Sequence, residues 1–239
     1  MEKIIFLDFD GVLFDTVDEA YQICINSDTF KNEKLPKNSL ELFRKFRPLV
    51  GPAWNYYFIM NSIIGFSRIT NTNFINSAEA QKFELDFFHT RNRLKNENYN
   101  DWLKFNKKYV FLDELEKIVD DNFKIFIITT KDKKTVIDLL YTYRINFIKD
   151  ENIMSKVDFN KFGSKKAIIL NQLINKKYKA LFIDDLYYHL KGCEDIYNLQ
   201  LIQADWGYVD IDNPNIYICS IQETLTKIIN LKKEDHEQK

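Results

Sequence analysis

Short apolar runs followed directly by polar residues recur along the chain. Residues 4–7, 123–128 and 180–183 form such runs, and their length is typical of a buried strand rather than of a helix. Elsewhere apolar residues recur at intervals of three and four, which predicts amphipathic helices. Strands that alternate with helices form a parallel sheet with helices on both faces. The pattern therefore predicts an α/β fold with a Rossmann-like core.

The remaining apolar segments extend this alternation and show one interruption. Further strands are expected at residues 145–148, 199–202 and 216–218. Helices are expected at residues 15–31, 40–46, 112–121, 133–143, 163–175 and 221–231. Residues 16–108 have a mostly helical and strongly aromatic pattern without strands, which predicts a separate helical lobe inserted after the first strand. The core is then expected at residues 1–15 and 109–231, and the charged residues 232–239 as a flexible tail.

The composition is that of a globular protein without a strong bias toward one kind of partner. The 239 residues are 45% hydrophobic and 29% charged, and 34 basic against 35 acidic residues give a formal net charge of -1. This balance argues against nucleic acid or an anionic membrane as the main partner. The three cysteines form no C-x-x-C pair, so we expect free thiols rather than disulfides or a zinc site. The sequence shows neither a signal peptide nor an apolar segment of membrane-spanning length, so we expect a cytoplasmic protein.

Several common catalytic motifs are missing from the sequence. The six glycines are too widely spaced to form a dinucleotide-binding, nucleophile-elbow or P-loop motif. The three histidines form no H-E-x-x-H helix. The usual signatures of dinucleotide-dependent enzymes, serine hydrolases, P-loop enzymes and zinc peptidases are therefore absent.

Acidic and hydroxyl side chains follow three of the predicted strands, at the strand ends where ligands bind in open α/β sheets. They are Asp8 and Asp10, Thr129 and Thr130, and Asp184 and Asp185. If these ends meet, several carboxylates share one pocket, and two such charges about 4 Å apart repel by roughly 4 kcal/mol at an effective dielectric near 20. A lysine at the start of a nearby helix, Lys165 or Lys166, together with a divalent cation would offset this repulsion. Ligation by oxygen alone suits Mg²⁺.

Taken in chain order, these residues resemble the four motifs of the haloacid dehalogenase superfamily of phosphohydrolases. The insertion at residues 16–108 is similar to the helical C1 cap of that family, so the resemblance covers the whole chain. It implies an enzyme that hydrolyses phosphate esters by positioning the phosphoryl group and stabilising its charge.

The resemblance also implies a role for each residue of the core. Asp8 would be the nucleophile that forms an aspartyl-phosphate, and Asp10 would protonate the leaving oxygen and later activate water. Thr129 would hydrogen-bond the phosphoryl oxygens, and Thr130 is a further candidate for substrate binding. Lys165 would neutralise the charge of the nucleophile and the phosphate.

The metal ligands implied by the resemblance come from the same strand ends. Asp185, assisted by Asp184, would hold Mg²⁺ together with the Asp8 carboxylate and the main-chain carbonyl of Asp10. The family often carries a further Asp or Asn four residues after the second acid of the last motif, where this chain has His189. We interpret His189 as a structural or exposed residue rather than a catalyst.

Two identities refine the interpretation of the core. In this superfamily an acid two residues after the nucleophile accompanies phosphate-ester chemistry, so Asp10 favours a phosphatase or phosphomutase over a dehalogenase or phosphonatase. Lys165 is preferred to Lys166 because it lies at the opening of the helix, although the proline that usually follows the motif lysine is missing.

Substrate choice is expected to reside in the inserted lobe. Arg47, Gly51 and Trp54 lie in a proline- and glycine-containing loop where the specificity loop of a C1 cap would be, so they are candidates to face the leaving group. Alternatively, Trp54 packs in the core of the lobe and Arg47 pairs with a surface acid. A closing cap favours small soluble esters such as sugar, polyol or amino-alcohol phosphates.

Three other functions fit parts of the pattern. A phosphomutase of the same superfamily would use the same core residues, but would protect the aspartyl-phosphate from water. A metal-dependent glycosyltransferase also carries D-x-D after an apolar strand. A binding module without activity is disfavoured, since both acids of the first motif, Asp8 and Asp10, are present.

Overall fold

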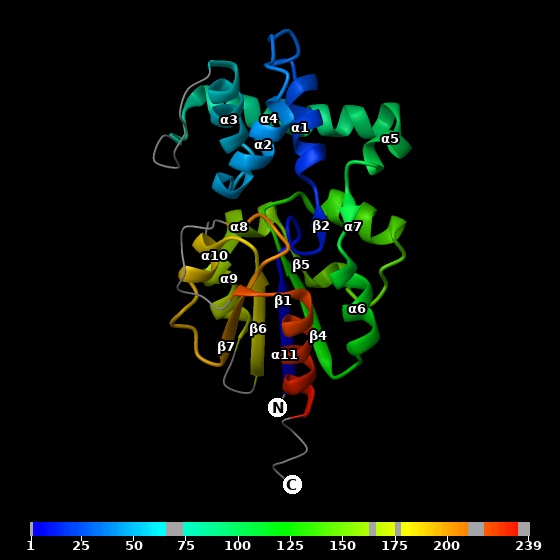
Figure 1. The fold of residues 1–239 in the computed structure, drawn as a ribbon. Coiled ribbons are helices and arrows are strands. Elements are labelled where there is room, and N and C mark those ends of the chain that lie inside the picture. The colour runs from blue at the N-terminus through cyan, green and yellow to red at the C-terminus, as the bar shows by residue number, and fades with distance from the viewer. Residues whose placement is uncertain (1, 66–73, 163–165, 175–177, 210–217, 234–239) are drawn as a thin grey trace. The chain divides into compact units, whose positions relative to one another are not determined.

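A computed structural model describes residues 2–65, 74–162, 166–174, 178–209 and 218–233 of the chain (Figure 1). The chain divides into two compact units, Met1–Phe14 with Lys108–Lys239, and Asp15–Lys107. The first, which we call the sheet unit, is built on a parallel sheet, and the second, the helical unit, consists of helices. In the described part of the chain, no helix combines the length and the apolar character needed to cross a membrane.

The sheet unit contains a six-stranded sheet in the order β5-β4-β1-β6-β7-β8, and its neighbouring strands are parallel. The strands are β1 (Glu2–Leu7), β4 (Phe123–Ile128), β5 (Ile153–Met154), β6 (Tyr178–Asp184), β7 (Leu199–Ala204) and β8 (Ile218–Cys219). β1 lies between β4 and β6, and Leu7 pairs with both Ile127 and Ile183. The three strands therefore end at the same edge of the sheet, and the predicted α/β fold with a Rossmann-like core is confirmed.

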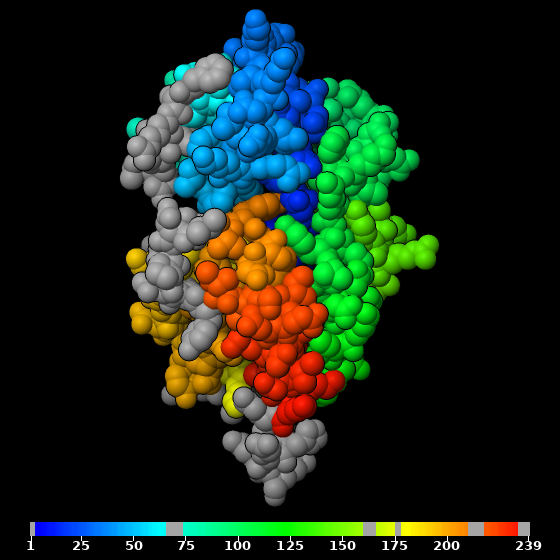
Figure 2. All heavy atoms as spheres, viewed as in Figure 1, coloured from blue at the N-terminus to red at the C-terminus, as the bar shows by residue number. Residues whose placement is uncertain are grey.

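Helices pack against this sheet on both faces (Figure 1). They are α6 (Val110–Ile118), α7 (Lys133–Thr142), α8 (Lys156–Phe162), α9 (Lys166–Leu173), α10 (Tyr187–Lys191) and α11 (Ile221–Lys233), with a short 3-10 turn at Asp150–Asn152. Ile4 and Phe6 of β1 share a buried core with residues of α8, α9 and α10, such as Ile169. Figure 2 shows the atoms of α11, in red, beside those of α6, in green, and the two helices are in contact.

The strand predicted at residues 145–148 is wrong. These residues follow α7 as a loop with a bend, and the neighbour of β4 at this side of the sheet is β5. Ile145 and Ile148 are nevertheless buried. A buried loop and a short strand both need a short run of apolar residues, so the pattern at residues 145–148 does not distinguish them. β5 was not expected because its two residues are too few to show a periodic pattern. Of the strand predicted at 216–218, the structure describes Ile218, which belongs to β8. Of the helix predicted at 163–175, it describes residues 166–174, which form α9 up to Leu173.

The described part of the helical unit is built mainly of helices. They are α1 (Val17–Asn26), α2 (Ser39–Phe46), the 3-10 turn η1 (Arg47–Leu49), α3 (Asn55–Gly65), α4 (Ala78–Glu97) and α5 (Tyr99–Leu103). The short strands β2 (Phe14–Asp15) and β3 (Lys107–Lys108) pair with each other. Phe43, Tyr56 and Phe87 form consecutive ring stacks in the core, which explains the aromatic composition of this segment.

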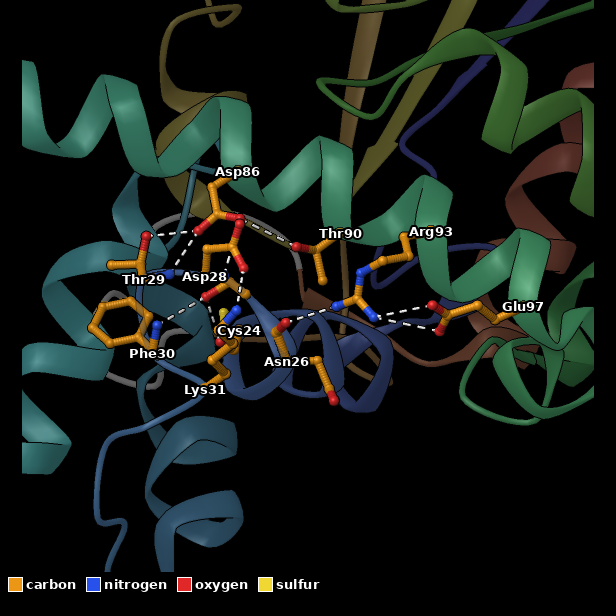
Figure 3. Close-up of polar contacts among 11 residues, drawn as sticks. Cys24, Asn26, Asp28, Thr29, Phe30, Lys31, Asp86, Thr90, Arg93 and Glu97 are labelled. Atoms are coloured by element: carbon orange, nitrogen blue, oxygen red, sulfur yellow. Dashed lines mark hydrogen bonds and ion pairs between the residues drawn. The ribbon is translucent and has the colours of Figure 1, made fainter.

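The first helix of this unit ends earlier than expected, at Asn26 rather than near Lys31. Figure 3 shows the reason, because the chain after α1 is bound by polar groups of α4. The Asp86 carboxylate accepts hydrogen bonds from the backbone N–H groups of Asp28, at 3.1 Å, and Thr29, at 2.8 Å. These side chain to backbone bonds hold the segment in a turn, which a helical pattern in the sequence does not indicate.

A buried ion pair joins three helices of the helical unit. The Glu19 carboxylate of α1 accepts hydrogen bonds from Arg91 of α4, with 2.7 Å between Nε and Oε1 and 3.2 Å between Nη2 and Oε2. Trp102 of α5 donates its indole N–H to the same Oε1 atom at 3.0 Å. The Arg91 guanidinium also lies 5.0 Å from the centre of the Phe87 ring. One buried carboxylate thus organises contacts that come from distant parts of the sequence.

Substitution of Glu19 by alanine is expected to lower the free energy of unfolding of the helical unit by about 3–5 kcal/mol, because it leaves the Arg91 guanidinium buried without its bidentate partner. Denaturant unfolding followed by circular dichroism measures the change. The control is Glu97→Ala, which breaks the exposed ion pair with Arg93 and should cost less than about 1 kcal/mol. Equal effects of the two substitutions would contradict the importance of the buried pair.

Candidate active site

The edge where β1, β4 and β6 end brings together the acids and hydroxyls that follow these strands. Asp8 comes directly after β1, and its backbone N–H donates to the carbonyl of Ile183 in β6 at 2.9 Å. Thr129 follows β4, and Asp184 is the last residue of β6. Asp8, Thr129 and Asp184 are all buried. A buried cluster of charged and polar groups at this edge requires partners of opposite charge.

Lys166 provides one such partner. Its Nζ atom lies 2.8 Å from Oδ1 of Asp8 and 2.7 Å from Oδ2 of Asp184, and its side chain is 2% exposed. Burial by itself would lower the pKa of Lys166, but the Asp184 and Asp8 carboxylates raise it above its ordinary value. The group is therefore a permanent ammonium at this site. Lys165, which was preferred from the sequence, lies outside the described residues, and the structure brings its alternative, Lys166, to the cluster.

The pKa values of the two acids beside Lys166 shift in opposite directions. Burial raises the pKa of Asp8 above its ordinary value, and the opposing attraction of Lys166 is too weak to cancel this effect. Burial also acts to raise the pKa of Asp184, but His189 and Lys166 together hold it well below the usual range. Asp184 is thus stable as a carboxylate, whereas ionised Asp8 is held at a cost in free energy.

His189 is the least expected member of this cluster. It lies on α10, and its Nδ1 atom is 3.1 Å from both carboxylate oxygens of Asp184. Its side chain is 13% exposed. The sequence led us to interpret His189 as a structural or exposed residue, because it occupies a position where the family often has Asp or Asn. The sequence alone gives no signal that its ring lies against Asp184.

Asp185 is packed against two glycines. Its Oδ2 atom accepts the backbone N–H of Tyr208 at 2.7 Å. Gly11 has a φ of +91°, and a Cβ atom there would lie 2.1 Å from the same Oδ2 atom. A Cβ on Gly207 would lie 2.4 Å from Cβ of Asp185 and 2.4 Å from the carbonyl oxygen of Gly11. Only glycine fits at these two positions, so the turn after β1 forms a close cradle around the Asp185 carboxylate.

Asp10 has a basic neighbour that the motifs did not indicate. Nζ of Lys131 is 3.1 Å from Oδ1 of Asp10, and the lysine side chain is 2% exposed. This contact links the loops after β1 and β4, and within the second loop the backbone N–H of Lys131 donates to Oγ1 of Thr129 at 3.1 Å. Thr130, between these two residues, is partly buried. Lys131 belongs to the run of polar residues that follows β4, and this position in the sequence is the signal by which it could have been found.

The three loop residues proposed to select the substrate belong to the helical unit. Nη1 of the buried Arg47 donates to the carbonyl of Val50 at 3.1 Å, and the N–H of Gly51 donates to Oδ1 of Asn55 at 2.9 Å. Trp54 is partly buried, with its ring edge-on to that of Phe58. These contacts stabilise the loop between α2 and α3, and the role of the three residues in substrate binding stays a prediction.

The side chains of the cluster fit a divalent cation. Asp8, Asp184 and His189 each offer a ligand atom, and these atoms lie within 4.8 Å of one another. In this cluster the two carboxylates of Asp8 and Asp184 stand against one ammonium, that of Lys166. One formal negative charge remains, which favours a cation, and carboxylate oxygens are the ligands that Mg²⁺ prefers in proteins.

Comparison with known proteins identifies the fold. No protein-family model and no curated protein matches the chain. A predicted phosphatase from Clostridium acetobutylicum is 18% identical with a TM-score of 0.65, and the match covers 96% of this chain and 99% of that chain. A haloacid dehalogenase-like hydrolase from Streptococcus pneumoniae is 18% identical with a TM-score of 0.62, covering 94% and 97%. A predicted phosphoglycolate phosphatase from Haemophilus somnus is 16% identical with a TM-score of 0.62, covering 95% and 97%. The chain therefore has the fold of these hydrolases over nearly its whole length.

Proposed function

We propose that the protein is a metal-dependent phosphatase of the haloacid dehalogenase superfamily, acting on a small phosphorylated metabolite through an aspartyl-phosphate on Asp8. The observation that carries the proposal is the bridge from the buried ammonium of Lys166 to both Asp8 and Asp184, with Asp10 two residues after Asp8. The order of the motifs along the chain and the fold shared with solved phosphatases support the same conclusion.

In the first half of the proposed reaction, a carboxylate oxygen of Asp8 attacks the phosphorus atom of the ester. The bond between phosphorus and the ester oxygen breaks, and protonated Asp10 gives its proton to that oxygen, which leaves as an alcohol. Lys166 neutralises charge on Asp8 and on the phosphoryl group, and Thr129 donates its hydroxyl to a phosphoryl oxygen. The elevated pKa of Asp8 supports this role, since a carboxylate that is poorly stabilised by its surroundings is a better nucleophile.

In the second half, Asp10 takes a proton from a water molecule, which attacks the phosphorus atom of the aspartyl-phosphate. Inorganic phosphate leaves, and the carboxylate of Asp8 is restored. Lys131 lies beside Asp10 and would orient its carboxylate in both steps. A divalent metal held by Asp8, Asp184 and Asp185, with the main-chain carbonyl of Asp10, would supply positive charge for the phosphate.

The proposed substrate is a small ester because the chain inserts a helical unit between the first strand and the rest of the sheet unit. In the proposed assignment this unit is the cap, and Arg47, Gly51 and Trp54 are the candidates for contact with the leaving group. A cap that closes over the reacting phosphate excludes folded partners and admits sugar, polyol, amino-alcohol or short-acid phosphates.

Phosphate release from a panel of such esters tests the proposal. The panel includes 2-phosphoglycolate, since a predicted phosphoglycolate phosphatase shares the fold. We expect release from at least one ester in the presence of Mg²⁺, and loss of this activity when the metal is removed with a chelator and its return when metal is added back. A folded protein that transfers labelled phosphate between two hydroxyls without releasing it would be a phosphomutase, and hydrolysis unaffected by chelation would contradict the metal-dependent mechanism.

A further inference from the structure

The cluster around Asp184 contains a nitrogen ligand beside the carboxylates. His189 Nδ1 lies 3.1 Å from each oxygen of Asp184, and ligand atoms of these two residues and Asp8 lie within 4.8 Å of one another. Asp8 and Asp184 are buried, and His189 is mostly so. The ring nitrogen of His189 therefore makes a specific polar contact with a buried carboxylate, which packing at the surface does not require.

The separations within the cluster match those of ligands around one metal ion. Two ligands about 2.1 Å from a metal and at right angles to each other are about 3.0 Å apart, and opposite ligands are about 4.2 Å apart. The distance of 3.1 Å between Nδ1 and Asp184 matches that between two ligands at right angles. All the ligand atoms lie within 4.8 Å of one another, which also leaves room for ligands on opposite sides of the metal. Lys166 contacts Oδ1 of Asp8 and Oδ2 of Asp184. Oδ1 of Asp184 accepts the backbone N–H of Leu186 at 2.9 Å, and a carboxylate oxygen has a second lone pair that could bind a cation.

Imidazole nitrogen changes which metal such a site prefers. Mg²⁺ is a hard cation that binds through oxygen, whereas Mn²⁺ and the later divalent transition metals accept nitrogen and oxygen together. We propose that His189 is a direct metal ligand, with Asp8 and Asp184, and that this site therefore selects Mn²⁺ over Mg²⁺. The inference deepens the proposed function and rests on it for the presence of a metal in this cluster.

The competing explanation is that His189 only donates a hydrogen bond to Asp184. Metal affinity alone does not separate the two explanations. Metal binding becomes weaker when a ligand is lost, and it also becomes weaker, by about 10–100-fold, when a residue that supports a ligand is lost. The decisive measurement is therefore nuclear coupling between the bound metal and the histidine nitrogen. Pulsed electron paramagnetic resonance of Mn²⁺ bound to the full-length protein, without a histidine tag, detects such coupling.

We expect a ¹⁴N signal from the Mn²⁺-loaded protein that becomes a ¹⁵N signal when the histidines are labelled with ¹⁵N. The signal should disappear in His189→Asn and persist in His89→Asn and His236→Asn, which alter the other two histidines of the chain. Titration calorimetry should show weaker Mn²⁺ binding in His189→Asn, by on the order of 10-fold or more, with a smaller change for Mg²⁺. The labelling experiment needs no variant, so it decides the question even if His189→Asn does not fold.

Failure of this inference is distinguishable from failure of the proposed function. Mn²⁺ binding without histidine coupling, or the absence of Mn²⁺ binding, would overturn the role of His189, and metal-dependent phosphate release would still support the phosphatase. Histidine coupling without phosphate release from any ester would leave the metal site established and overturn the proposed reaction instead.

Discussion

Asp8→Asn is expected to reduce phosphate release by at least about 10³-fold, because the amide cannot form the aspartyl-phosphate on which both halves of the proposed reaction depend. The measurement is the steady-state rate of phosphate release on the best ester of the panel, with metal at saturation. Asp205→Asn, at an exposed aspartate of the same unit, is the matched control and should keep the activity of the unmodified protein.

The same substitution should leave the protein folded. Burial raises the pKa of Asp8, so its ionised form costs free energy in the folded state, and neutral asparagine avoids this cost. Lys166 keeps its contact with Asp184, so its buried ammonium still has an acidic partner. Thermal unfolding in chelator should therefore show a midpoint that is unchanged or higher. Activity of Asp8→Asn close to that of the control would remove Asp8 from the role of nucleophile.

Lys166→Met is expected to lower both activity and stability, and Lys165→Met to change neither strongly. Methionine at position 166 leaves Asp8 and Asp184 buried without the ammonium that lies between them. Loss of one partner from a buried charged cluster typically costs about 3–5 kcal/mol of folding free energy. Loss of a charge that stabilises the phosphoryl group should lower the rate of phosphate release on the order of 10²–10³-fold.

Denaturant unfolding in chelator and the rate of phosphate release measure these two effects. Lys165→Met is the control because it removes the same charge from the adjacent position. Lys166→Arg keeps the charge but changes its shape, and should recover stability more than activity. If instead Lys165→Met abolishes phosphate release and Lys166→Met retains it, the lysine first preferred from the sequence is the functional one.

Local pattern was sufficient for the main strands and for the acids that follow them. The lengths of the apolar runs and the polar residues at their ends identify β1, β4 and β6, and place Asp8 and Asp184 at strand ends. These features depend on neighbours in the sequence, because a buried strand needs a short apolar run. Pattern failed for residues 145–148, since side chains can be buried without any pairing of the backbone.

The sequence by itself determined the α/β fold, the insertion of a helical segment and the identity of the acids, whereas the tertiary structure decided which basic groups meet those acids. Lys165 and Lys166 are adjacent, and only the packing of α9 against the sheet brings the Lys166 ammonium between Asp8 and Asp184. Lys131 and His189 likewise reach Asp10 and Asp184 through the directions of their side chains. Such directions arise from contacts between elements that are distant in the chain, so no local pattern of hydrophobic and polar residues specifies them.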